Sequence, residues 1–175
     1  MLHLKHMTPT LLKSHLANHS NKIVEICGPS PKGYELLQKW NISLPTNLIV
    51  TNISNPITIN PFGDNPETFE VDEVQDIRRL TYGASSVGTL LVSYLPHYDQ
   101  KESDYLLEYD NPGEPKHNLH VFLYKEAGRV LQKGGLLIQV GPFSSYEKAA
   151  QYYGLRVAFI DEETATVIFE KNVKK

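Results

Sequence analysis

The sequence predicts a doubly wound α/β domain, built on a mostly parallel seven-stranded sheet that ends in a C-terminal antiparallel hairpin. Four short apolar runs each end in turn residues, as strands buried on both faces do. They cover residues 22–27, 47–53, 87–95 and 135–140. Helical patterns separate these runs, and strands that alternate with helices form a parallel sheet. The last two runs, residues 155–160 and 164–170, are joined by a short acidic turn and predict the hairpin.

The remaining elements follow from periodicity and from residues that begin or end helices. A weaker apolar run predicts a further strand at residues 69–74. Helical spacing of apolar residues predicts helices at residues 8–19, 33–40, 119–131 and 145–153. Residues 54–68 hold three prolines, so a full crossover helix cannot form there. Residues 97–118 are polar and predict a long loop or lid, because loops longer than about 12–15 residues are often binding segments.

Length and composition bound the domain count and the classes of partner. With 175 residues, the chain fits one domain, residues 1–175, in which residues 1–20 form an N-terminal helical arm. A net charge of −3 offers no basic stripe for a nucleic-acid partner. No apolar run approaches the roughly 20 residues that span a bilayer. The single cysteine, Cys27, allows no intrachain disulfide, so a cytoplasmic location is expected. The oligomeric state cannot be inferred from the sequence.

The segment after the first predicted strand, residues 25–34 (EICGPSPKGY), joins a strand end, a glycine turn and a helix start. Such a turn lets backbone approach a ligand closely, and a helix N-terminus favours an anionic group. Gly28 and Gly33 have the spacing of a P-loop, but a Tyr-Glu pair replaces the required Lys-Ser/Thr. Ser30 replaces the middle glycine of the dinucleotide fingerprint, which disfavours a nicotinamide-dependent oxidoreductase. A purely structural tight turn remains an alternative.

Histidines give no support for a metal site. His117 and His120 lie three residues apart at the start of a predicted helix. No Cys, Asp or Glu stands at a convincing spacing to complete a ligand set with them. The expectation is therefore that the protein holds no metal.

Several segments together carry a resemblance to a known family. They are Glu25 with the glycine turn, residues 52–54 (NIS), residues 76–82 (DIRRLTY), residues 86–97 (SVGTLLVSYLPH) and, most specifically, residues 124–137 (YKEAGRVLQKGGLL). With them, residues 20–171 resemble the class I S-adenosylmethionine-dependent methyltransferases, which have a Rossmann-like fold. The closing hairpin is also a trait of that family and not of dehydrogenases.

This resemblance implies a Rossmann-like methyltransferase fold and a cofactor site at the strand ends. In it, Glu25 and the backbone of Gly28, Pro29 and Ser30 would hold the methionine part of S-adenosylmethionine, and Asn52 would bond the ribose hydroxyls. Ile53 would pack on the adenine, and Asp76, beside Ile77, would accept a hydrogen bond from the adenine amino group. Ser93, Tyr94 and Leu95 would line the sulfonium and the substrate. Tyr94 or His97 would be the catalytic residue beside a small-molecule methyl acceptor.

The sequence departs from the family pattern at three places. Asn52 stands where an acid is common, and a neutral amide makes weaker bonds to hydroxyls than a carboxylate does. Pro29 and Pro31 remove two backbone donors from the turn. The crossover helix after Asn52 is missing. Two functions therefore stay open: a methyltransferase that acts on a small molecule, and a catalytically inactive methyltransferase-like binding or scaffold domain.

Overall fold

The computed structural model describes residues 7–18, 20–59, 67–93, 95, 119–141 and 147–172. Its helical segments are α1 (Pro9–Leu16), the 3-10 turn η1 (Pro31–Tyr34), α2 (Glu35–Lys39), α3 (Leu119–Val130) and α4 (Glu147–Tyr152). Its strands are β1 (Ile23–Ile26), β2 (Leu48–Asn52), β3 (Ile57–Ile59), β4 (Glu67–Phe69), β5 (Glu73–Val74), β6 (Val87–Ser93), β7 (Leu131–Val140), β8 (Leu155–Asp161) and β9 (Thr166–Lys171).

Seven of these strands form one sheet in the order β5-β2-β1-β6-β7-β9-β8. The five strands from β5 to β7 run parallel, whereas β9 is antiparallel to both β7 and β8. The predicted fold class, a mostly parallel seven-stranded sheet with a closing antiparallel hairpin, is therefore confirmed. The hairpin folds back so that β9, and not β8, lies against β7.

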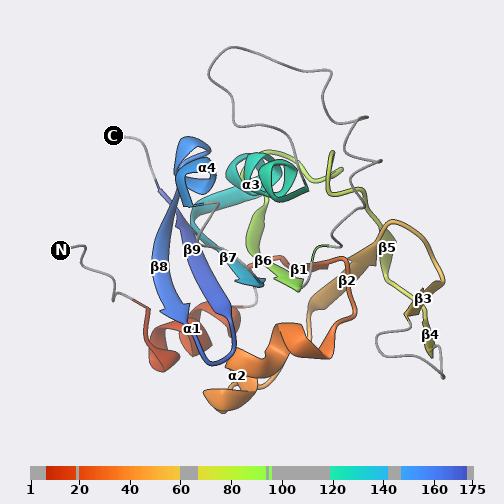
Figure 1. Cartoon of the computed structure of the whole chain (residues 1–175), viewed down its shortest axis with the longest axis horizontal. Helices are drawn as coiled ribbons and strands as arrows, with labels where there is room; N and C mark the ends of the chain where they lie inside the picture. The colour runs from red at the N-terminus through yellow and green to blue at the C-terminus, as the bar shows by residue number, and fades with distance from the viewer. Residues whose placement is uncertain are drawn as a thin grey trace.

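Helices cover both faces of this sheet (Figure 1). On one face, α3 and α4 pack on a core that includes Leu90, Leu137 and Phe169. On the other face, α1 and α2 cover a second core that includes Leu36, Leu91 and Ile168. Because side chains alternate along a strand, Leu90 and Leu91 lie in different cores. This two-sided burial explains why the central strands are continuous apolar runs.

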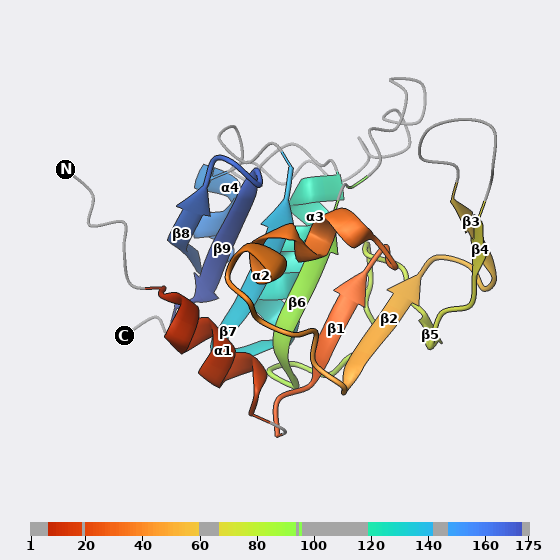
Figure 2. The same ribbon diagram turned by 90° about the horizontal axis from the view of Figure 1, so that it is seen from below.

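The segment between β2 and β5 holds the main departure from a regular doubly wound fold. Its described residues form the antiparallel pair β3 and β4, which lies beyond the β5 edge of the sheet (Figure 2). The prediction that no full crossover helix forms there agrees with this strand pair. The single strand predicted at residues 69–74 is divided between β4 and β5, which pair with different partners.

The ends of several elements differ from the predicted bounds. Helix α3 passes directly into β7 at Leu131, so the strand begins four residues before the predicted start at Gly135. Gly134, expected near the helix end, has a positive φ of 71° inside β7. The helix predicted over residues 33–40 begins as a 3-10 turn and becomes α-helical at Glu35. Within the described ranges, no helix is long and apolar enough to cross a membrane.

Candidate functional site

The carboxyl ends of the parallel strands meet at one edge of the sheet (Figure 2). Strand β1 pairs with β2 on one side and with β6 on the other. The chain therefore moves outward from β1 to β2 and β5 before it returns to β6 and continues to β7. In open α/β sheets, ligands bind outside the carboxyl ends at such a reversal of strand order. The turn after β1 lies at this place.

The Glu25 carboxylate is buried beneath that turn and is bonded to it. Its Oε1 accepts a hydrogen bond from the Ser30 amide at 2.9 Å, and its Oε2 accepts one from the Tyr34 hydroxyl. Glu25 is only 1% exposed, and burial raises the pKa of its carboxyl, an effect that the two hydrogen bonds oppose. The turn thus wraps around an acidic side chain that the sequence assigned to the cofactor.

Two glycines allow this close wrapping. A Cβ at Gly28 would lie 2.4 Å from Glu25 Cδ, which no side chain tolerates without a shift. A Cβ at Gly33 would lie 3.2 Å from the Ser93 hydroxyl oxygen at the end of β6. That hydroxyl is buried and has no hydrogen-bond partner among the described residues. A buried polar atom without a partner requires an explanation, and a bound water or ligand is one of them.

Asn52, the last residue of β2, joins that strand to the turn. Its Nδ2 donates to the Gly28 carbonyl at 2.8 Å, and its Oδ1 accepts from the Ile53 amide at 2.7 Å. The Gly28 amide in turn donates to the Thr51 carbonyl at 2.9 Å. Both backbone polar groups of Gly28 are therefore bonded to the end of β2.

Beyond Asn52 the site becomes open and apolar. Ile53 is 55% exposed, as Val74 on β5 also is, whereas Ile77 is buried. Asp76 accepts hydrogen bonds from the backbone and guanidinium of Arg78, which hold the pKa of its carboxyl below the ordinary value. Its side chain remains 35% exposed, so it can accept further donors. Asp76 lies in a turn and not at the start of a helix, because residues 77–80 form no helix in the structure.

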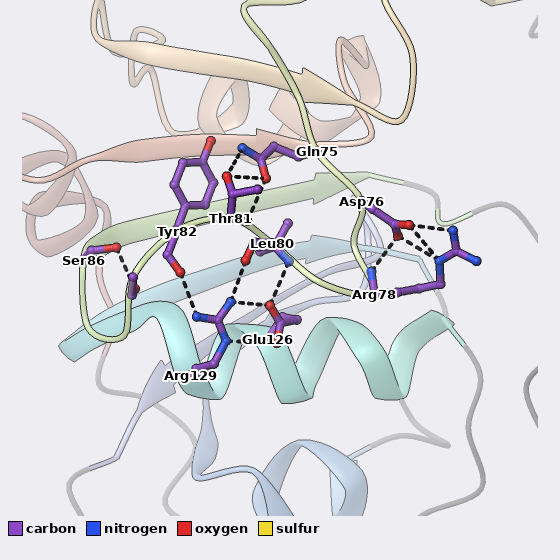
Figure 3. Close-up of polar contacts among 10 residues, drawn as sticks. Gln75, Asp76, Arg78, Leu80, Thr81, Tyr82, Ser86, Glu126 and Arg129 are labelled. Atoms are coloured by element: carbon purple, nitrogen blue, oxygen red, sulfur yellow. Dashed lines mark hydrogen bonds and ion pairs between the residues drawn. The ribbon is translucent and has the colours of Figure 1, made fainter. Parts of the chain in front are cut away.

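Helix α3 holds the segment that follows Asp76 (Figure 3). The Arg129 guanidinium donates to the Tyr82 carbonyl at 2.7 Å and to the Leu80 carbonyl at 2.8 Å. The Glu126 carboxylate accepts from the Leu80 amide at 2.8 Å and pairs with Arg129. Gln75 completes the arrangement, since its Oε1 accepts from the Thr81 amide at 3.0 Å. These contacts fix residues 75–82 without a helix.

The remaining predicted site residues are placed as follows. Pro29 and Ser30 are half-buried in the turn, and Leu95 is buried in the core beneath α3. Tyr94 and His97, the predicted catalytic residues, lie outside the described residues, as does the predicted loop or lid at residues 97–118.

A buried polar chain lies between α3 and β7. The Tyr124 hydroxyl donates to Gln139 Oε1 at 3.0 Å, and Gln139 Nε2 lies 3.1 Å from His120 Nδ1. His120 therefore has a side-chain amide as a partner. His117, the residue considered with it as a metal ligand, lies outside the described ranges. Among the described residues, no three His, Cys, Asp or Glu side chains gather as a metal site.

Sequence reasoning did not identify Tyr34, Glu126 or Arg129 as parts of this region. The i,i+3 spacing of Glu126 and Arg129 on a helix could have indicated an ion pair. No spacing rule could have shown that Arg129 reaches two carbonyls more than 45 residues earlier in the chain. The contact of Tyr34 with Glu25 depends on the path of the turn between them, so no spacing rule predicts it.

The fold resembles that of solved methyltransferases. A chain from the complex between the Haloferax volcanii Trm112 methyltransferase activator and a candidate methyltransferase matches with a TM-score of 0.51 at 13% identity, covering 94% of this chain and 89% of that chain. The chain has the Rossmann-like fold of class I methyltransferases. At this identity the likeness concerns the fold alone. No protein-family model and no curated protein match the sequence.

Two further solved structures with this methyltransferase fold match at lower scores. The antibiotic-resistance methyltransferase Kmr has a TM-score of 0.46 at 12% identity, covering 97% of this chain and 95% of that chain. A geranyl diphosphate methyltransferase, solved with its diphosphate substrate and sinefungin, has a TM-score of 0.46 at 8% identity, covering 93% and 76%.

Proposed function

We propose that the protein is an S-adenosylmethionine-dependent methyltransferase that acts on a small-molecule acceptor. The observation that carries the proposal is the turn after β1. It lies where the strand order reverses, and its glycines pack directly above Glu25 and the Ser93 hydroxyl, which has no hydrogen-bond partner within the described part of the chain. A close backbone approach at that place is what a methyltransferase fold needs to bind a nucleoside cofactor.

The residues at the strand ends fit the parts of S-adenosylmethionine in order. Gly28, Pro29 and Ser30, fixed from below by Glu25, would hold the methionine part, and the Ser93 hydroxyl with Leu95 would lie toward the sulfonium. The ribose would lie at Asn52. Exposed Ile53 and buried Ile77 would flank the adenine. The exposed edge of Asp76 would accept from the adenine amino group.

The bound cofactor supplies an electrophilic methyl group, and the protein aligns the acceptor with it. Alignment and exclusion of water give most of the rate in such a displacement. A base is needed only where the acceptor must lose a proton. Tyr94 and His97, which follow β6, are the residues proposed beside the acceptor.

Isothermal titration with S-adenosylmethionine and S-adenosylhomocysteine tests the cofactor proposal. We expect micromolar binding that is lost in Asp76→Ala. The fold should persist, since the bonds that the Asp76 side chain makes in the structure are to Arg78 nearby. Glu170→Ala is the matched control, because it removes a carboxylate that pairs with Arg156, an exposed arginine on the neighbouring strand β8. Unchanged affinity in Asp76→Ala would refute its assignment to the adenine.

A second candidate function is a catalytically inactive methyltransferase-like binding or scaffold domain. It is favoured by the internal bonds of Glu25 and Asn52, which already satisfy the side chains assigned to the cofactor. Formation of S-adenosylhomocysteine from S-adenosylmethionine with any acceptor would exclude it. Absence of cofactor binding at millimolar concentration would favour it, and the search would then turn to protein partners.

A further inference from the structure

Asn52 stands where the family resemblance implies an acid, and its amide has two different backbone partners. Nδ2 donates to the Gly28 carbonyl, and Oδ1 accepts from the Ile53 amide. The orientation of the amide is determined by this pair, because a flipped group would place oxygen against carbonyl and N–H against N–H. Asn52 is 6% exposed, so water does not readily replace either bond.

A carboxylate could make only one of these bonds. It would still accept from the Ile53 amide, but it has no hydrogen to donate to Gly28. The Gly28 carbonyl would then lose its donor and face a negative charge at the distance where the amide now donates, 2.8 Å. Leaving a buried acceptor unpaired is more costly than the net value of a typical hydrogen bond.

We infer that Asn52 is a positioning residue, whose amide donor holds the glycine turn to β2, and that the site requires the amide and not the family's acid. As far as it concerns cofactor binding, this inference rests on the proposed function. The Gly28 amide donates to the Thr51 carbonyl, and the Gly28 carbonyl accepts from the Asn52 side chain. The turn is therefore attached to β2 at two points, and the Asn52 side chain makes the second.

The variant Asn52→Asp distinguishes this role from that of a ribose ligand, because the two roles predict opposite changes in affinity for S-adenosylhomocysteine. A ribose ligand would gain charge-assisted bonds, so the variant would bind S-adenosylhomocysteine more tightly near neutral pH. A positioning amide predicts the reverse, with affinity weaker by roughly tenfold, since leaving a buried acceptor without a donor is costly. Titration calorimetry of wild type and variant at the same pH distinguishes the two.

The pH profile of this variant gives a readout that simple loss of packing would not produce. When the introduced carboxyl is protonated, it regains an O–H donor for Gly28, so affinity and unfolding temperature should recover as the pH falls toward about 5. The deficit in stability grows as the pH rises, because burial raises the pKa of the introduced acid in the folded state above its unfolded value. Among the described residues, Glu25, Cys27, Tyr34 and Asp76 are ionisable groups near the turn, and wild type measured at each pH accounts for their titration.

Asn47→Asp is the matched control at the opposite end of β2. There Nδ2 donates to the Asn21 carbonyl at 3.1 Å, so the control also removes an amide donor from a backbone carbonyl. We expect it to lose stability with unchanged affinity for S-adenosylhomocysteine. If wild type binds no cofactor, the proposed function fails, and the unfolding temperature of Asn52→Asp still decides the inference. A variant as stable as wild type across the pH range, or one that binds more tightly near neutral pH, would overturn it.

Discussion

The contact between α3 and residues 80–82 predicts a large loss of folding stability from one substitution, Arg129→Ala. Arg129 donates to two backbone carbonyls and pairs with Glu126, whose side chain is 8% exposed (Figure 3). Removing one partner of a buried ion pair costs about 3–5 kcal/mol, because the other charge stays buried. The Arg129 side chain is itself 38% exposed, so water replaces part of what is lost. We therefore expect about 2–3 kcal/mol of destabilisation.

Urea unfolding followed by circular dichroism measures this change, with Arg156→Ala as the control. Arg156 pairs with Glu170 by a similar carboxylate contact, but its side chain is 50% exposed. An exposed pair contributes about 0–1 kcal/mol, so the control should change little. The double variant with Glu126→Gln should cost less than the sum of the single variants, because neither charge is then left alone. Equal effects of Arg129→Ala and Arg156→Ala would refute the reasoning.

Three further predictions concern the turn after β1. Burial raises the pKa of Glu25 above its ordinary 4.5, so the folded state binds this proton more tightly than the unfolded state. Stability therefore falls as the pH rises through the folded pKa. Glu25→Gln should remove this fall in urea unfolding at several pH values, and an unchanged profile would contradict the prediction. Gly28→Ala places a Cβ 2.4 Å from Glu25 Cδ and should cost about 1–3 kcal/mol in the same assay, whereas a neutral effect would mean that Glu25 can move away. Burial raises the pKa of the Cys27 thiol to about 11. Iodoacetamide at neutral pH should therefore label this thiol slowly in the folded protein and quickly in urea. Fast labelling of the folded protein would contradict the prediction and show that the thiol is accessible.

Much of the fold could be predicted from the sequence, because buried parallel strands stand out as short, continuously apolar runs. The apolar runs at residues 22–27, 47–53 and 87–95 correspond to β1, β2 and β6. The helix predicted at residues 119–131 matches α3 to within one residue at its end. Burial on both faces makes these strands continuously apolar, whereas helices keep a 3.6-residue period. The type of each of these elements could therefore be predicted from the sequence, while ends such as the start of β7 depended on the strands that pair with them.

The assignment of Glu25, Asn52 and Asp76 to a cofactor stays a prediction. Glu25 lies near the carboxyl end of β1, Asn52 ends β2, and Asp76 follows β5. Their bonding could not be predicted, since Tyr34 reaches Glu25 through a 3-10 turn and Asn52 reaches Gly28 from the neighbouring strand. Each of these contacts depends on the relative position of backbone segments that no sequence spacing specifies.

The alternation of strands and helices, the closing hairpin and the glycine turn can be predicted from the sequence alone, because they depend on local hydrophobic patterning and backbone freedom. The position of β9 between β7 and β8, and the bonds from Arg129 on α3 to residues 80 and 82, appear only in three dimensions. The same holds for the hydrogen bond from the Asn52 amide to the Gly28 carbonyl. Strand order and side-chain partners result from packing among distant segments, and the energies of those contacts are set by burial in three dimensions.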